Sequence, residues 1–318
     1  MGARIERVDT AAVVRGSLQG RRFNPGGLAF EASLLLMLLV SLAVLVTLLA
    51  DIIGGAIPVF RDRGLDFVTS GITLDSDTAG VWTGLLGSVA ITLVVAVVAF
   101  PMGIGAAIYL EEYAPGNSMT RFIQTNIRNL AGVPSIVYGL LGLAVFVRLV
   151  DLIGLGGSGS TAGRNVVSAG ITLAVLVLPI VIITASEALR AVPDAIREAG
   201  FGVGATRWEV VRHHVLPAAA PGVLTGTVLA LARAFGETAP LLVIGVATGF
   251  FSAGSASVFD RLTGTYTALP VVVLSWSRQA DPAFKEHLAP AAILVLLVVL
   301  FVANAAAITL RNKYDRDW

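Results

Sequence analysis

Long runs without charged side chains dominate this sequence of 318 residues. Five runs of at least 19 such residues occupy positions 32–50, 78–110, 129–147, 165–186 and 288–310. A helix needs roughly 20 mostly apolar residues to cross the hydrocarbon core of a bilayer. Only 14% of the residues are charged, whereas soluble domains carry about 25%. The pattern excludes a water-soluble enzyme and a disordered chain, and predicts a protein that crosses a membrane several times.

A sixth span is predicted at 221–245, although it contains two charged residues. The run at 262–277 is short for a span and is expected to be interfacial or re-entrant. The predicted fold is therefore all-α, with six transmembrane helices. The expected segments are a cytoplasmic tail at 1–27, a first transmembrane anchor at 28–57, a transmembrane domain at 78–310 with a cytoplasmic loop at 190–217, and a C-terminal tail at 311–318.

The distribution of basic residues predicts the orientation. With an even number of spans, both termini lie on one side, and that side holds 14 of the 22 Lys and Arg residues against 7 on the other. Basic residues collect on the cytoplasmic side of membrane proteins, so both termini are expected in the cytoplasm. Membrane lipid is an expected partner. The net charge of +1 provides no field for nucleic acid.

Several kinds of chemistry have no support in the sequence. The chain has no cysteine, and its three histidines lack the i, i+4 spacing of a helical metal site. Neither lysine lies in the glycine-rich sequence that holds ATP phosphates. We therefore expect no cofactor, no metal and no catalytic residue. Energy for active work must come from a partner or an ion gradient.

The sequence of the loop at 190–217 predicts two short helices joined by a glycine-containing turn, called the elbow below. The first helix starts near Pro193 and is expected to be broken by three glycines, Gly200, Gly202 and Gly204. The second starts at Thr206, which has Glu209 three residues later as in a capping box.

Three apolar residues of the second helix are spaced at i, i+3 and i+7, namely Trp208, Val211 and Val215. This spacing predicts an apolar stripe on the surface of the helix. Pro217 is expected to end the helix. The stripe could pack on the protein's own cytoplasmic end or dock in a partner's groove.

This loop resembles the signature loop of ABC-importer permeases, which reads Glu-Ala-Ala, three residues, Gly, nine residues, Ile, one residue, Leu-Pro. Five of the seven positions agree with correct spacing: Glu198, Ala199, Gly204, Leu216 and Pro217. Gly200 replaces the second Ala and is expected to loosen the helix end, and His214 replaces Ile and weakens an apolar contact. The resemblance implies that the loop docks in a cleft of an ATPase subunit, with Trp208 and Val211 in contact.

Arg233 lies at the midpoint of the predicted span 221–245, where an unpaired charge costs about 2.5–3.5 kcal/mol or more. It could form a structural pair with Glu237, four residues later. For an ion pair four residues apart on a helix, Arg before Glu is the less favourable order. A protein with two apolar residues in place of a buried ion pair is often at least as stable. Both points favour a substrate path. A guanidinium suits an oxyanion such as phosphate, and Glu237 could accept a hydrogen bond from a protonated oxygen or pair with Arg233.

The run from Arg233 to Pro240 resembles the Arg-Ala-x-Gly-Glu-Thr motif of phosphate-importer permeases, and its final Ala-Pro resembles the PstA-type subunits. Further matches occur at 100–113, 129–140 and 268–276, so the resemblance covers the chain from about residue 83 onward. It implies the type I ABC-importer permease fold. It adds Thr238 and Ser135 as candidates for the substrate path, although packing explains Ser135 equally well.

The same resemblance implies an assembly in the bacterial inner membrane. Its expected partners are a homologous second permease, two ATP-binding subunits and an extracytoplasmic phosphate-binding protein. A permease for another oxyanion, such as sulfate or molybdate, and an ion-coupled carrier or channel remain alternatives. Glu111, Glu112 and Tyr113, at the cytoplasmic end of the second span, are expected to form a solvated cap.

Overall fold

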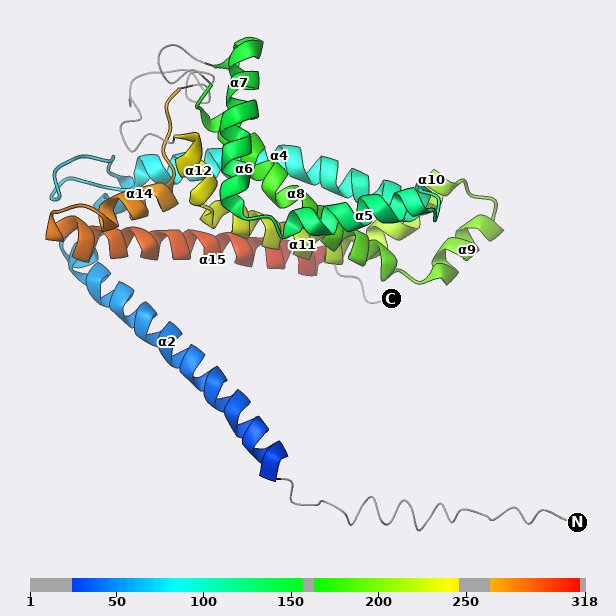
Figure 1. Ribbon diagram of the computed structural model, residues 1–318, viewed down its shortest axis with the longest axis horizontal. Helices are drawn as coiled ribbons and strands as arrows, with labels where there is room; N and C mark the ends of the chain where they lie inside the picture. The colour runs from blue at the N-terminus through cyan, green and yellow to red at the C-terminus, as the bar shows by residue number, and fades with distance from the viewer. Residues whose placement is uncertain (1–24, 157–162, 246–263, 315–318) are drawn as a thin grey trace, which may run out of the picture. The chain divides into compact units, whose positions relative to one another are not determined.

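A computed structural model describes residues 25–156, 163–245 and 264–314. Every regular element in these ranges is a helix (Figure 1). Six apolar helices are long enough to cross a membrane, which confirms the predicted number of spans and the all-α fold. They are Pro25–Arg63, Trp82–Tyr113, Ser135–Leu155, Val166–Arg190, Arg207–Gly236 and Ala283–Thr309.

Most of these long helices contain more than one element. The elements that build them are α2 (Pro25–Arg63), α4 (Trp82–Ile108) with η1 (Tyr109–Tyr113), α6 (Ser135–Leu141) with η2 (Gly142–Phe146), α7 (Val147–Val150) and η3 (Asp151–Leu155), α8 (Val166–Arg190), α10 (Arg207–Val210) with η4 (Val211–Val215) and α11 (Leu216–Gly236), and η5 (Ala283–Leu288) with α15 (Ala289–Tyr314). Shorter separate helices are α3 (Asp66–Thr69), α5 (Ser118–Ala131), α9 (Asp194–Gly202), α12 (Ala239–Ile244) and α14 (Leu269–Ser277).

The chain divides into two compact units, and the boundary along the sequence lies between residues 51 and 52. In the first, α2 is a continuous helix, and all of its side chains up to Asp51 are exposed. Such an apolar surface is what a lipid-facing helix presents. The last turns of α2 belong to the second unit, where Ala56 and Val59 are buried.

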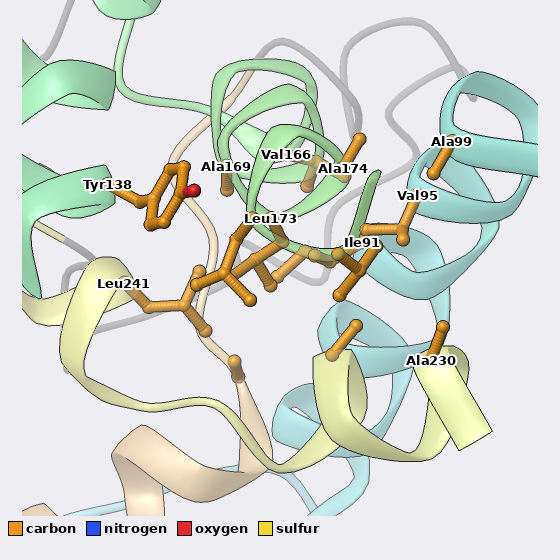
Figure 2. Close-up of a cluster of buried hydrophobic side chains, with 14 of the residues drawn as sticks. Ile91, Val95, Ala99, Tyr138, Val166, Ala169, Leu173, Ala174, Ala230 and Leu241 are labelled. Atoms are coloured by element: carbon orange, nitrogen blue, oxygen red, sulfur yellow. The ribbon is translucent and has the colours of Figure 1, made fainter. Parts of the chain in front are cut away.

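Helix α8 lies at the centre of the second unit and packs against α4 and α11. Figure 2 shows Leu173 and its neighbours on α8 between side chains of α4, α6, α11 and α12. Small residues allow close approach, as at Gly170, where an added methyl group would collide with Val94 of α4. The core of the unit is therefore a tightly packed contact of membrane helices.

The third span starts later than predicted. The sequence pattern placed it at 129–147, but α5 ends at Ala131 and α6 begins at Ser135, and the chain changes direction between them (Figure 1). Pro134 causes this break because it lacks a backbone N–H group. The apolar helix then continues through Arg148 and Asp151 to Leu155, since charges are tolerated near the end of a span.

The short run at 262–277 is described from residue 264 onward. Residues 265–268 are non-helical and lead into α14, a buried helix of 9 residues that is too short to cross a membrane. The helix is too short for a further span, as predicted, and its re-entrant or interfacial placement stays a prediction. Trp276 of α14 packs between Phe67 and Phe284, with ring centroids 6.3 and 5.6 Å away.

Candidate functional site

The helix that carries Arg233 is interrupted. Helix α11 ends at Gly236, Glu237 is extended with φ −73° and ψ 124°, and α12 begins at Ala239. Pro240 in the first turn of α12 favours the break, because proline suits a helix start but not a helix interior. The expectation of one continuous span at 221–245 with Arg233 at its midpoint is therefore wrong. Arg233 lies in the last turn of α11.

Arg233 and Glu237 form an ion pair across this break. The Nε atom of Arg233 donates to Oε1 of Glu237 at 3.2 Å. The Arg233 side chain is 47% exposed and that of Glu237 is 17% exposed. In the described part of the chain, no acceptor contacts the two terminal nitrogens of Arg233. The guanidinium therefore keeps donors for a ligand, and its charge suits the negative end of the α11 dipole.

The other two path candidates lie on adjoining elements. Thr238 is the residue before α12, and its carbonyl accepts the N–H of Leu242 at 3.1 Å. Ser135 is the first residue of α6, which packs on α12 where Gly139 meets the backbone of Pro240. Among the described residues, no hydrogen bond joins Ser135 to Arg233 or Glu237. The structure thus pairs Arg233 with Glu237, with Thr238 next in the chain, and places Ser135 on a helix that packs against α12.

The predicted cytoplasmic elbow is present, with different limits. Gly204 adopts φ +84° between α9 and α10. Thr206 and Glu209 form the predicted capping box: the Thr206 hydroxyl accepts the N–H of Glu209, and the Glu209 carboxylate accepts the N–H of Thr206. Gly200 lies inside α9 and does not break it, whereas Gly202 is the last residue of this helix.

Pro217 does not end the second helix either, because α10, η4 and α11 follow without interruption. The wider turn of η4, at Val211–Val215, precedes Pro217 and leaves room for its ring. The predicted second helix is therefore the N-terminal part of the fifth span.

Gly200 has a packing role that the sequence did not suggest. A β-carbon at this position would lie 2.7 Å from Cγ2 of Val210. Gly200 therefore allows α9 to approach α10 closely, where a looser helix end was expected. Glycine in place of the second alanine of the Glu-Ala-Ala pattern leaves room for the side chain of Val210.

The predicted apolar stripe is divided between the interior and the surface. Val211 and Val215 are 1% and 0% exposed, so the expectation that they are in view is wrong. Trp208 remains 52% exposed, and Phe201 and Val203 beside the elbow are 47% and 84% exposed. Sequence reasoning missed these two because they fall outside the helical spacing. We define the elbow face as Phe201, Val203 and Trp208.

Two ion pairs hold the elbow region to the C-terminal end of the second span. Arg190 contacts Glu111 at 2.6 Å, and Arg197 contacts Glu112 at 2.8 Å. Glu112 is only 6% exposed, so the expected solvated cap is wrong at this residue. Its hydrogen bonds raise the pKa of the Arg197 guanidinium above the ordinary value. Pairs that join distant sequence positions cannot be read from local spacing.

These features together define a multi-pass membrane protein with an interrupted helix. The chain belongs to the family described as binding-protein-dependent transport system inner membrane component, whose model matches residues 99–312. It is a permease subunit of an ABC importer, a transport component and not an enzyme.

Two curated relatives illustrate the similarity. The probable ABC transporter permease protein YqgH of Bacillus subtilis is 34% identical over 72% of this chain and 71% of its own length. The phosphate transport system permease protein PstA 1 of Mycobacterium tuberculosis is 33% identical over 74% of this chain and 72% of its own length.

A solved structure shares the fold. A chain of a bacterial alginate ABC transporter, in complex with an alginate-bound periplasmic protein, matches with a TM-score of 0.61. The match covers 95% of this chain and 96% of that one, with 16% sequence identity. At this identity the likeness shows the type I permease fold alone.

Proposed function

We propose that this chain is the PstA-type permease subunit of an ATP-driven importer of inorganic phosphate. It forms one half of the translocation path, and a homologous permease forms the other half. The observation that carries the proposal is the half-exposed guanidinium of Arg233, paired with Glu237 where a membrane helix is interrupted. Substrate sites in transporters are often built at discontinuous helices. The relative named as a phosphate transport permease supports phosphate as the substrate.

The Arg233–Glu237 pair suits an anion that must bind and then leave. The free donors of Arg233 bind phosphate oxygens, and the nearby carboxylate reduces the net positive charge. Glu237 accepts a hydrogen bond from a protonated phosphate oxygen, and it pairs with Arg233 again once the phosphate has moved on. Thr238 and Ser135 add hydroxyl groups along this route.

The elbow is proposed to transmit the force of ATP binding. Two ATP-binding subunits each receive an elbow in a surface cleft, and their closure draws the two elbows together. Phe201, Val203 and Trp208 supply the apolar contact because they are exposed, whereas Val211 is buried. Glu198, Ala199, Gly200, Gly204, Leu216 and Pro217 shape the elbow.

Phosphate reaches the outward-facing path from an extracytoplasmic binding protein. In the proposed topology both chain termini lie in the cytoplasm of a bacterial cell, and the elbow lies on the same side. The Lys and Arg distribution supports this orientation.

Uptake by the reconstituted complex tests the substrate. Proteoliposomes that contain both permeases and the ATPase subunits receive the binding protein outside and ATP inside, and accumulation of radiolabelled phosphate is measured. We expect ATP-dependent uptake that excess unlabelled phosphate abolishes and excess sulfate or molybdate does not. Equal competition by sulfate would favour the other-oxyanion alternative. Uptake without ATP, driven by an ion gradient, would favour the ion-coupled carrier.

A further inference from the structure

Tyr266 places a hydroxyl group without a hydrogen-bond partner deep inside the second unit. The residue is 2% exposed, and its oxygen has no partner in the described part of the chain. A buried hydroxyl is normally hydrogen-bonded, because it has given up its bonds to water. A buried hydroxyl without a partner is therefore a candidate to form a hydrogen bond with a ligand in another conformation of the protein.

The segment around Tyr266 is unusual for the interior of a membrane protein. Residues 265–268 are non-helical, and the N–H of Leu269 that follows them donates to Oγ of Ser88 on α4 at 2.8 Å. Non-helical backbone is tolerated at membrane depth where it is buried in protein or lines a polar cavity. The sequence pattern predicts this segment to be re-entrant or interfacial. None of the four candidate residues of the phosphate path lies in it.

The position of Tyr266 connects it to the interrupted helix. Tyr266 belongs to the same buried cluster as Ala234 of α11 and Leu241 of α12. Ala234 follows Arg233 directly in the sequence, and Leu241 lies four residues after Glu237. Tyr138 of α6, the helix that begins at Ser135, is in the cluster as well (Figure 2). Tyr266 thus shares one buried cluster with residues of the elements that carry or adjoin the four path candidates.

Thr267 provides a contrast one residue away. It is 1% exposed, and its hydroxyl also lacks a partner among the described residues. Tyr266 and Ala268 both belong to the cluster that contains Ala234. They are two residues apart, the spacing at which side chains of an extended segment share a face. Successive side chains of an extended segment point to opposite sides, so we expect Thr267 to face away from Tyr266.

We propose that the Tyr266 hydroxyl is a substrate ligand of the translocation path, which donates a hydrogen bond to the oxyanion as it passes the break between α11 and α12. A neutral donor contacts an oxyanion without adding charge that would trap it. In the present conformation the hydroxyl is covered by protein, so the proposed contact forms in another state of the transport cycle. The inference rests on the proposed function and adds a specificity-determining residue to it.

The test compares Tyr266→Phe with Thr267→Val in the complete complex. Both changes remove an unpaired buried hydroxyl and keep the shape of the side chain. We expect Tyr266→Phe to raise the KM for phosphate uptake by about 3- to 10-fold, the effect of one lost hydrogen bond. We expect Thr267→Val to leave KM unchanged. Neither change should lower the melting temperature, because each removes an unsatisfied polar atom from apolar surroundings.

Two results would overturn the inference. Wild-type KM in Tyr266→Phe would show that the hydroxyl has no contact with substrate, and an equal rise in Thr267→Val would show that the segment only needs to be intact. If Tyr266→Phe does not assemble, fluorotyrosine at position 266 provides a stronger donor in the same place. It should lower KM, and an unchanged KM would again count against the proposal.

The wild-type complex separates this inference from the proposed function. If it takes up sulfate or molybdate in place of phosphate, the proposed substrate is wrong. The same pair of variants is then compared with the oxyanion that is transported, and the same changes in KM decide the role of Tyr266.

Discussion

The carboxylate of Glu112 accepts two N–H groups of Arg197, from Nη2 at 2.8 Å and from Nε at 3.2 Å. Glu112 ends the second span and Arg197 lies in α9 of the elbow, 85 residues later. Arg197 also donates to the carbonyl oxygens of Val192 and Leu189. One guanidinium therefore joins a membrane helix, the end of α8 and the first helix of the elbow.

Replacing Glu112 with Gln should destabilise this junction. The side chains of Arg197 and Glu112 are 18% and 7% exposed, and removing one partner of a buried pair costs about 3–5 kcal/mol. The remaining bonds of Arg197 should keep the loss near the lower limit. Asp194→Asn is the matched control, because Asp194 contacts the same arginine but is 90% exposed. Thermal unfolding of the purified complex should show a clear fall in Tm for Glu112→Gln and almost none for Asp194→Asn. Equal shifts would contradict the account.

Gly200→Ala should destabilise the elbow even though alanine matches the family pattern. The new methyl group meets Val210, and overpacking of this kind costs about 1–3 kcal/mol, offset in part by the better helix propensity of alanine. The double variant Gly200→Ala with Val210→Ala should recover most of the stability lost at Gly200. A double-mutant cycle of melting temperatures measures this coupling. Independent effects of the two changes would show that the residues do not pack as described.

Trp208→Glu should release the ATPase subunits and leave the permease folded. The side chain is 52% exposed, so a charge there disturbs a docking surface more than the fold. Phe201→Glu should act similarly, and Trp208→Phe should retain binding. Co-purification of ATPase subunits measures the effect, and the Tm of the permease pair reports on folding. Stoichiometric ATPase retained by both glutamate variants would exclude the elbow face as the docking site.

The sequence predicted the helices well and their ends less well. Charge-free runs of membrane length identify spans because the bilayer imposes the requirement directly. The capping box at Thr206 was equally readable, since all its partners are local. Proline was ambiguous: Pro134 and Pro240 mark helix starts, whereas Pro217 lies within a long helix beside a wider turn. Local pattern does not distinguish these cases.

Contacts between distant segments account for the other differences. The sequence could not indicate that Val210 fills the space beside Gly200 or that Val211 faces inward. It also could not pair Glu112 with Arg197, or reveal that Tyr266 shares a buried cluster with residues of α11 and α12. Each depends on how α8, α9 and α11 pack in three dimensions.

The central claim is that Arg233 contacts the transported anion, and phosphate uptake by Arg233→Gln tests it most directly. Complexes with Arg233→Gln or Glu237→Gln are reconstituted beside the wild type, and subunit composition and Tm are checked first. A charge-assisted hydrogen bond contributes roughly 1.5–3 kcal/mol, which corresponds to a loss of about 10- to 150-fold in transport efficiency. We predict a loss in this range for Arg233→Gln and a smaller one for Glu237→Gln. Wild-type uptake by both variants in intact complexes would contradict the account.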